Sequence, residues 1–286
     1  MGRTYKEGTM THDPRAFRRL LPVALMAFAM LAATTTVAET PEVQELVRGM
    51  KQALEPARPS LRKLTLTVAQ GGTTSTVTLG QARGTVNGGS RILSVVLAPA
   101  DLRGTAYLVQ EQPASPSDQL WVYVPAIGRV RTVVGPEAFS AFLNSDFTYS
   151  DLGFIALRWQ YGVKGEDTTN GVKAYLLEGI PQQNWYYARV VSLVAATGFM
   201  PIRRDFFDPS NQPWKVERFE KVVTIGGVPT PLTISMDDTQ SKSRTTLSVT
   251  DLKYDAQVPE ALLQPQGMPQ AVTSPVWNAL DAPVGK

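Results

Sequence analysis

Alternation of apolar and polar residues constrains what this chain can fold into more than any other feature. Residues 63–68 read Lys-Leu-Thr-Leu-Thr-Val, and residues 232–237 read Leu-Thr-Ile-Ser-Met-Asp. A period of two places every apolar side chain on the same face of a strand. Strands that are apolar on one face only are typical of antiparallel sheets. The pattern therefore predicts half-buried antiparallel strands.

Similar segments recur about every ten residues after position 60, often separated by Gly-Gly or Asn-Gly turn signals. Besides 63–68 and 232–237, the predicted strands are 73–79, 82–87, 91–98, 104–111, 119–124, 129–133, 172–180, 188–195, 201–207, 214–224 and 244–254. No long linker or fixed-period repeat divides them. We therefore expect a mostly β protein with a few helices (α+β), built as one extended sheet, a sandwich or a barrel.

Two segments predict helical structure. Residues 43–54 carry an apolar stripe at helical spacing after Thr40-Pro41-Glu42, which is a typical helix start, and Pro56 ends them. Residues 136–143 (PEAFSAFL) predict a short helix inside a segment, 136–157, that is too polar for a central strand and too aromatic for an ordinary loop.

The N-terminal region resembles a secretory signal peptide. Arg15, Arg18 and Arg19 precede an apolar run over residues 20–33, and Thr36 and Ala38 supply small residues for cleavage. That run is shorter than the roughly 20 residues needed to span a bilayer. We expect residues 1–38, with Met1 or Met10 as the start, to direct export to the periplasm and to be removed near Ala38.

Composition excludes several function classes. Residues 1–38 hold the single His, five of the 28 basic residues and two of the 25 acidic residues, so the remainder is formally neutral and lacks both His and Cys. Disulfides, thiol nucleophiles, Ser-His-Asp triads and the usual zinc or haem sites are thereby excluded. A neutral chain also lacks the positive charge of nucleic-acid-binding proteins. We expect no metal, no cofactor and no nucleic-acid partner.

Asp146 and Asp151 flank Phe147 and Tyr149 in a Ser-Asp-Phe-Thr-Tyr-Ser-Asp run. One hypothesis makes them a carboxylate pair for acid–base hydrolysis. The favoured alternative is a turn in which the carboxylates bond local groups and the aromatic rings pack inward. The sequence also lacks GxSxG, P-loop and GxGxxG motifs. We therefore predict that the protein is not an enzyme.

Four segments carry a resemblance to a known family. They are DQLWVYVPAIGRVRTV (118–133), SAFLNSDFTYSDL (140–152), VKAYLLEGIP (172–181) and PIRRDFFDPSNQPWKVERFEKV (201–222). In order along roughly residues 40–268, the chain resembles the outer membrane lipoprotein-sorting (LolA-like) protein family. The residues that match its most specific block are Tyr123, Pro125, Arg129, Arg131, Phe142, Ser145, Asp146, Phe147, Tyr149, Asp151 and Leu152. Asn144 stands where the family usually has Gly, and Thr148 where it usually has Ser.

The resemblance implies a LolA-like domain over residues 39–268. The remaining residues, 269–286, are rich in Pro and small residues, which predicts a loose tail. The fold of the LolA-like domain would be an unclosed antiparallel β-barrel with a helical lid over an apolar cavity, as in LolA, LolB and the N-terminal part of RseB. Its function would be to carry a lipid or an acylated protein, as a monomer, with an RND-type exporter as a candidate membrane partner. An RseB-like sensor or interaction module that binds a protein or peptide is the alternative.

The same resemblance, together with the density of aromatic residues in a sheet that has few covering helices, indicates where the ligand would lie. The residues expected near the cavity or its mouth are Trp121, Tyr123, Phe142, Phe147, Tyr149 and Leu152.

Overall fold

A computed structural model describes residues 41–115, 117–182 and 185–280 of the chain. The predicted signal peptide and its cleavage site near Ala38 lie outside these residues. Within them, no helix is both long enough and apolar enough to cross a membrane.

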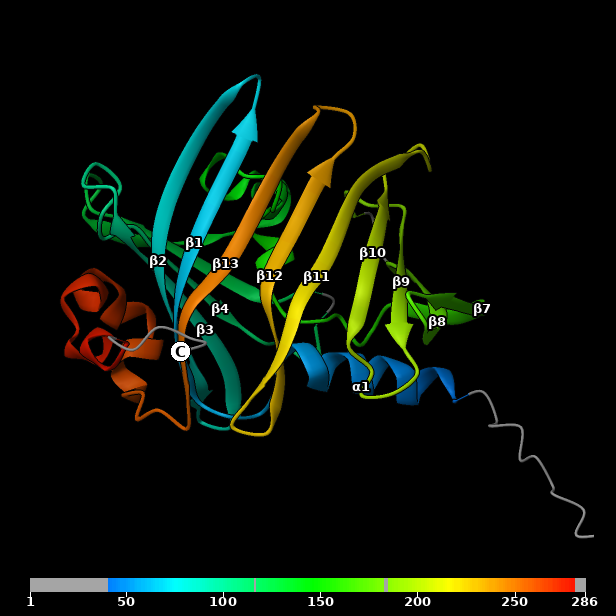
Figure 1. Ribbon diagram of the computed structural model, residues 1–286. Coiled ribbons are helices and arrows are strands. Elements are labelled where there is room, and N and C mark those ends of the chain that lie inside the picture. Colours follow the sequence, from blue (N-terminus) through cyan, green and yellow to red (C-terminus); the bar gives the residue numbers. More distant parts are fainter. Residues whose placement is uncertain (1–40, 116, 183–184, 281–286) are drawn as a thin grey trace, which may run out of the picture. The chain divides into compact units, whose positions relative to one another are not determined.

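The strands of the described residues form one antiparallel sheet (Figure 1). They are β1 (Ser60–Gln70), β2 (Thr73–Val86), β3 (Gly89–Ala98), β4 (Ala106–Gln110), β5 (Gln119–Val124), β6 (Arg129–Val133), β7 (Gln160–Thr169), β8 (Val172–Ile180), β9 (Arg189–Ala195), β10 (Pro201–Phe207), β11 (Pro213–Ile225), β12 (Val228–Asp238) and β13 (Ser243–Tyr254). Their spatial order is β6-β5-β4-β3-β2-β1-β13-β12-β11-β10-β9-β8-β7. The first and last strands pair in the middle, and β6 and β7, which are consecutive along the chain, form the two edges. The prediction of an unclosed antiparallel sheet is confirmed.

Two strands differ from the sequence prediction. β2 is a single strand where two were expected, over 73–79 and 82–87. β7 was not predicted, because its sequence QYGVKGEDTT has no regular apolar alternation. An edge strand with a largely solvated surface does not need that alternation, and charged residues on it discourage edge-to-edge aggregation.

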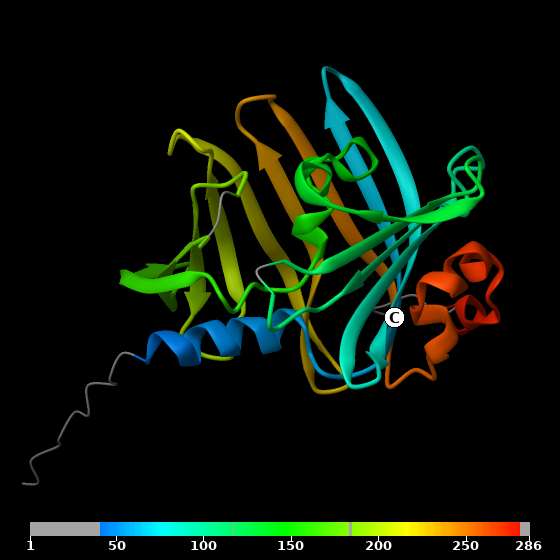
Figure 2. The same cartoon turned by 180° about the vertical axis from the view of Figure 1, so that it is seen from behind.

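Helix α1 (Val43–Leu54) begins and ends where the apolar stripe predicts. Its buried residues Leu46, Val47 and Met50 pack in one cluster with Tyr175 and Leu177 of β8 and with Val194 of β9. The helix lies across one end of the sheet (Figure 2). Its N-cap is Glu42, whose side chain makes no capping hydrogen bond, so burial of the apolar face is the stronger reason for the helix.

The inner face of the curved sheet is covered by residues 135–152, which we call the inner segment (Figure 2). It contains three short 3₁₀ turns, η1 (Gly135–Phe139), η2 (Phe142–Asn144) and η3 (Ser150–Leu152), in place of the helix expected over 136–143. Phe142 and Phe147 are 1% and 2% exposed and belong to the largest apolar cluster, which spans β1–β6, β9, β10 and β12. The inner segment therefore fills much of the concave side of the sheet.

The C-terminal residues pack on the opposite face. They form the 3₁₀ helices η4 (Glu260–Leu263), η5 (Pro265–Thr273) and η6 (Pro275–Ala279) beside β2, β3 and β4 (Figure 1). Met268 and Ala271 are fully buried, and the Trp277 ring lies over Gly80, where a Cβ atom would come within 3.0 Å of it. Residues 269–280 are thus packed rather than loose as the sequence suggested, because their small and apolar side chains cover an apolar outer face. Residues 281–286 lie outside the described part.

Candidate ligand-binding pocket

A pocket of about 700 Å³ is lined by residues from both edge strands of the sheet, β6 and β7. Thr132 and Val133 of β6 line one side, and Tyr161 of β7, with Trp159 just before it, lines the other. The floor and rim come from the 111–120 region, from the inner segment and from residues 153–158. This volume falls within the roughly 300–1,000 Å³ of small-molecule sites.

Aromatic rings form much of the wall. Trp185 lies 4.9 Å from Phe139 and 6.0 Å from Trp159, measured between ring centroids, and Tyr187 lies 4.7 Å from Phe206. All five residues line the pocket. Edge-to-face and tilted contacts of this kind hold rings at fixed angles, so this part of the wall is apolar and ordered, while polar side chains line much of the remainder.

Gly179 leaves space for the rings of Trp159 and Tyr161 close to strand β8. A Cβ atom at Gly179 of β8 would come within 2.7 Å of the Tyr161 ring and 3.2 Å of the Trp159 ring. The Tyr161 hydroxyl donates to the carbonyl oxygen of Ala156 at 3.0 Å. Burial raises the pKa of Tyr161 to about 12, so this side chain stays neutral.

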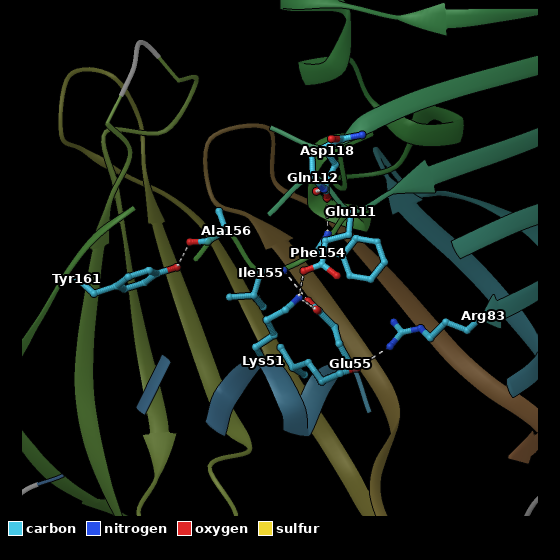
Figure 3. Close-up of polar contacts among 11 residues, drawn as sticks. Lys51, Glu55, Arg83, Glu111, Gln112, Asp118, Phe154, Ile155, Ala156 and Tyr161 are labelled. Atoms are coloured by element: carbon cyan, nitrogen blue, oxygen red, sulfur yellow. Dashed lines mark hydrogen bonds and ion pairs between the residues drawn. The ribbon is translucent and has the colours of Figure 1, made fainter. Parts of the chain in front are cut away.

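Polar contacts tie the C-terminal end of α1 to the pocket floor (Figure 3). Lys51 pairs with Glu55 and, at 2.9 Å, with Glu111. The backbone N–H of Ile155 donates to the Glu55 carboxylate. Burial raises the pKa of Glu55 despite the nearby Lys51 ammonium. This network fixes the 153–156 segment, which lines the pocket.

Asp118 holds a second part of the floor. Its carboxylate accepts from the N–H of Phe154 at 2.7 Å and from the N–H of Gln112 at 3.3 Å, as Figure 3 shows. Burial raises the pKa of Asp118 to about 6. The carboxylate therefore joins two loops that are distant in sequence.

One buried ion pair borders the pocket. Arg204 of β10, which lines it, donates from Nη1 to Glu217 of β11 at 3.0 Å. Burial, and then the charge of Asp151, raise the pKa of Glu217 to about 7, against the lowering effect of Arg204. The pair is thus largely desolvated beside the aromatic wall.

The two aspartates of the inner segment hold it in place. Asp146 is buried, and its carboxylate accepts from the hydroxyls of Ser243 and Thr245 on β13, while Lys215 donates to its backbone carbonyl at 2.6 Å. Asp151 accepts from the hydroxyls of Tyr186 and Tyr187 and from the backbone N–H of Thr148. Both carboxylates therefore have a structural role, which is the alternative that the sequence favoured over acid–base catalysis. Asp151 also lines the pocket.

The residues predicted to bind ligand are divided by the structure. Phe142 and Phe147 are buried in the largest apolar cluster, and Tyr149 and Leu152 pack against that cluster. All four therefore lie on the concave side of the sheet, and none of them lines the pocket. These four side chains belong to the inner segment and pack it onto the sheet.

Trp121 and Tyr123 lie on the wrong face for the predicted role. They pack with the C-terminal 3₁₀ helices on the outer side, while Leu120 and Val122 of the same strand face inward. Leu120 lines the pocket. Strand β5 is apolar on both faces, so its alternation could not show which side faces the cavity.

The other residues of the family block shape the inner segment and the turn before it. Arg131 pairs with Glu137, the Ser145 hydroxyl accepts from the N–H of Phe147 at 3.2 Å, and Pro125 and Arg129 are exposed. Asn144 has a φ of +56°, which is the left-handed conformation that a Gly at this position would adopt freely.

Several pocket residues were not predicted as site residues. They are Phe139, Trp159, Tyr161, Trp185, Tyr187, Arg204 and Phe206. The sequence is dense in aromatic residues, which include most of these positions, but this density did not assign them to the cavity. Arg204 and Phe206 alternate along β10, which was the one local signal that they share a face.

Comparisons with known proteins agree with this fold. A family model described as an uncharacterised protein matches residues 88–270. The chain is similar to the crystal structure of a DUF1329 family protein from Desulfovibrio piger ATCC 29098, with 25% identity and a TM-score of 0.72, over 78% of this chain and 95% of that one. No curated protein matches the sequence.

Two further solved structures are similar at lower identity. One is a Vibrio parahaemolyticus domain described as an outer membrane lipoprotein-sorting protein, with 22% identity and a TM-score of 0.74, over 79% of this chain and 97% of that one. The other is a LolA superfamily protein from Nitrosomonas europaea, with 17% identity and a TM-score of 0.65, over 79% and 98%. The resemblance to LolA-like proteins is confirmed as a shared fold.

Proposed function

Because this chain belongs to the family of uncharacterised proteins whose model matches residues 88–270, and has the LolA-superfamily fold, we propose that it is a periplasmic carrier of an amphiphilic ligand. The ligand is a lipid or the acyl chains of an acylated protein. The location rests on the signal peptide predicted over residues 1–38, with cleavage near Ala38.

The observation that carries this proposal is the aromatic pocket at the opening between β6 and β7. Val134 and Leu157, which are 67% and 38% exposed, line this pocket and add apolar surface to its border. Each methylene group moved from water into such a site contributes about 0.8 kcal/mol. An acyl chain that entered between the sheet edges would gain this energy without closing the barrel.

The role in trafficking is part of the proposal. The description of the Vibrio neighbour refers to lipoprotein sorting by that protein. For this chain we propose transfer of lipid or lipoprotein acyl chains toward the outer membrane, with an RND-type transporter as the membrane partner and the monomer as the carrying form. We propose binding without bond-making, because the two aspartates of the inner segment are engaged in holding it.

Uptake of a fluorescent acyl probe tests this function. Ala138→Trp places a large side chain at a position that lines the pocket, whereas Ala126→Trp adds the same ring at an exposed position in the β5–β6 turn. We expect saturable binding by the native protein and by Ala126→Trp, and a loss of at least about tenfold in affinity for Ala138→Trp.

Failure of the native protein to take up any acyl probe would remove the carrier proposal. If the native protein bound no acyl probe but captured one membrane protein or peptide, that result would support the alternative, an RseB-like sensor module.

A further inference from the structure

We propose that Arg204 binds the carboxylate of an acyl-chain ligand beside the aromatic wall of the pocket, so that the preferred ligand is an acid rather than a neutral lipid. This inference rests on the proposed carrier function and selects a lipid with a free acid group among its ligands, because the acyl chains of an acylated protein are linked as esters or amides and have no carboxylate.

The position of Arg204 is the first step. It lies on β10 and lines the pocket, beside the aromatic residues Tyr187 and Phe206. Its guanidinium carbon stands 5.0 Å from the centroid of the Phe206 ring, and its side chain is 17% exposed. A cation in this setting has lost most of its water and is adjacent to the surface that would hold an apolar chain.

Unused hydrogen-bonding capacity is the second step. A guanidinium has five N–H donors. One bond from Nη1 goes to Glu217, and among the described residues the buried Nε–H has no hydrogen-bond partner. A buried donor without an acceptor is unfavourable, and a carboxylate can accept two parallel N–H bonds from one guanidinium. A modest rotation of the Arg204 side chain would direct two of its N–H groups toward the two carboxylate oxygens of a ligand.

Charge is the third step. Glu217 is the partner that neutralises Arg204, but burial and Asp151 raise the pKa of Glu217 to about 7, so near neutral pH part of the molecules hold it protonated. Three carboxylates line the pocket, and each already has a partner. Asp118 and Asp151 accept bonds from backbone N–H groups or tyrosine hydroxyls, and Glu111 pairs with Lys51. Of the two arginines that line the pocket, Arg158 is exposed and Arg204 is mostly buried, so Arg204 is the cation beside the aromatic wall that has an unused donor.

Displacement of an acyl probe by dodecanoic acid and by methyl dodecanoate tests the inference, since the two ligands differ in charge at one end. We expect the native protein to bind the acid at least about tenfold more tightly than the ester, as a charge-assisted hydrogen bond would give. In Arg204→Met this preference disappears, and both ligands bind as the ester does. The double variant Arg204→Met/Glu217→Gln, which removes the whole ion pair, gives the same result if Arg204→Met alone folds poorly.

Arg218→Met is the matched control. Arg218 is on the neighbouring strand, faces the other side of the sheet and pairs with Asp237. This variant retains the preference for the acid. Equal binding of acid and ester by the native protein, or an unchanged preference in the Arg204 variants, overturns the inference and leaves the carrier function standing. Binding of neither ligand overturns the carrier function itself.

Discussion

Among single side chains, Asp146 and Asp151 show that residue type alone does not determine the role of a residue. Both are acidic residues in an aromatic segment, which the sequence allows as a catalytic pair. In the fold they point to different partners, β13 for Asp146 and the Tyr186–Tyr187 pair for Asp151. These partners come from positions 35 to 99 residues away along the chain, so no local pattern could identify them.

Replacing Asp146 tests this anchoring role. Asp146→Ala removes the acceptor of two hydroxyls in a buried site, and we expect a loss of about 2–3 kcal/mol in the free energy of unfolding. Urea denaturation followed by tryptophan fluorescence measures it. Asp101→Ala, at an exposed turn position, should change stability by less than about 0.5 kcal/mol. A similarly small effect for Asp146→Ala would show that the inner segment is not held by this residue.

Trp121 and Tyr123 were predicted at the cavity but lie on the outer face, and the reason can also be given for single residues. Alternation along β5 places them opposite Leu120 and Val122, and that relation is correct. Which face is inner depends on the C-terminal residues, which cover the outer face with apolar side chains of their own. A strand that is apolar on both faces needs this long-range information.

At the scale of elements, apolar periodicity predicted most of what the structure contains. α1 and most of the strands follow from it, because each must bury one face. β7 does not, since it is an edge strand, and the 3₁₀ turns of the inner segment do not, since their packing depends on the sheet around them. The position of α1 on β8 and β9 depends on a further feature, a close contact at Gly49.

A Cβ atom at Gly49 would come within 2.4 Å of the Phe199 ring, close to the base of that side chain. Gly49→Ala should therefore displace α1 and cost about 1–3 kcal/mol of unfolding free energy, although alanine favours helix formation. Thermal unfolding followed by circular dichroism measures the change. Gly162→Ala is the control, because nothing lies within 4 Å of its Cβ position. An increase in stability for Gly49→Ala would contradict the contact.

For the whole molecule, the decisive feature is that β6 and β7 are neighbours in sequence but opposite edges of one sheet. The sequence predicted an unclosed sheet through the family resemblance. It could not place the pocket, because residues from both edges, the inner segment and β10 come together only when the sheet curves.

Buried acids of the pocket region should make the stability of the whole domain depend on pH. Burial raises the pKa of Asp118 to about 6 and that of Glu217 to about 7, above their ordinary values of about 4. The folded state then binds more protons than the unfolded state, so these groups favour folding at low pH. Their contribution is fully present below about pH 4 and is lost as the pH rises through about 6–7.

We therefore expect the melting temperature to fall between about pH 5 and about pH 8, and to fall less in Glu217→Gln and in Asp118→Asn. Differential scanning fluorimetry at constant ionic strength measures these slopes, with Asp101→Asn as the exposed control. Slopes in the two pocket variants that equal the native one would show that these carboxyls do not hold their protons in the folded state.

Native mass spectrometry of the protein purified gently from a periplasmic extract tests the carrier function most directly. We predict a fraction of the native protein and of Ala126→Trp with the added mass of an amphiphile, identifiable after extraction, and its loss in Ala138→Trp. Bare protein mass in all three samples, together with no uptake of added fatty acid, would contradict the conclusion that this pocket carries an acyl chain.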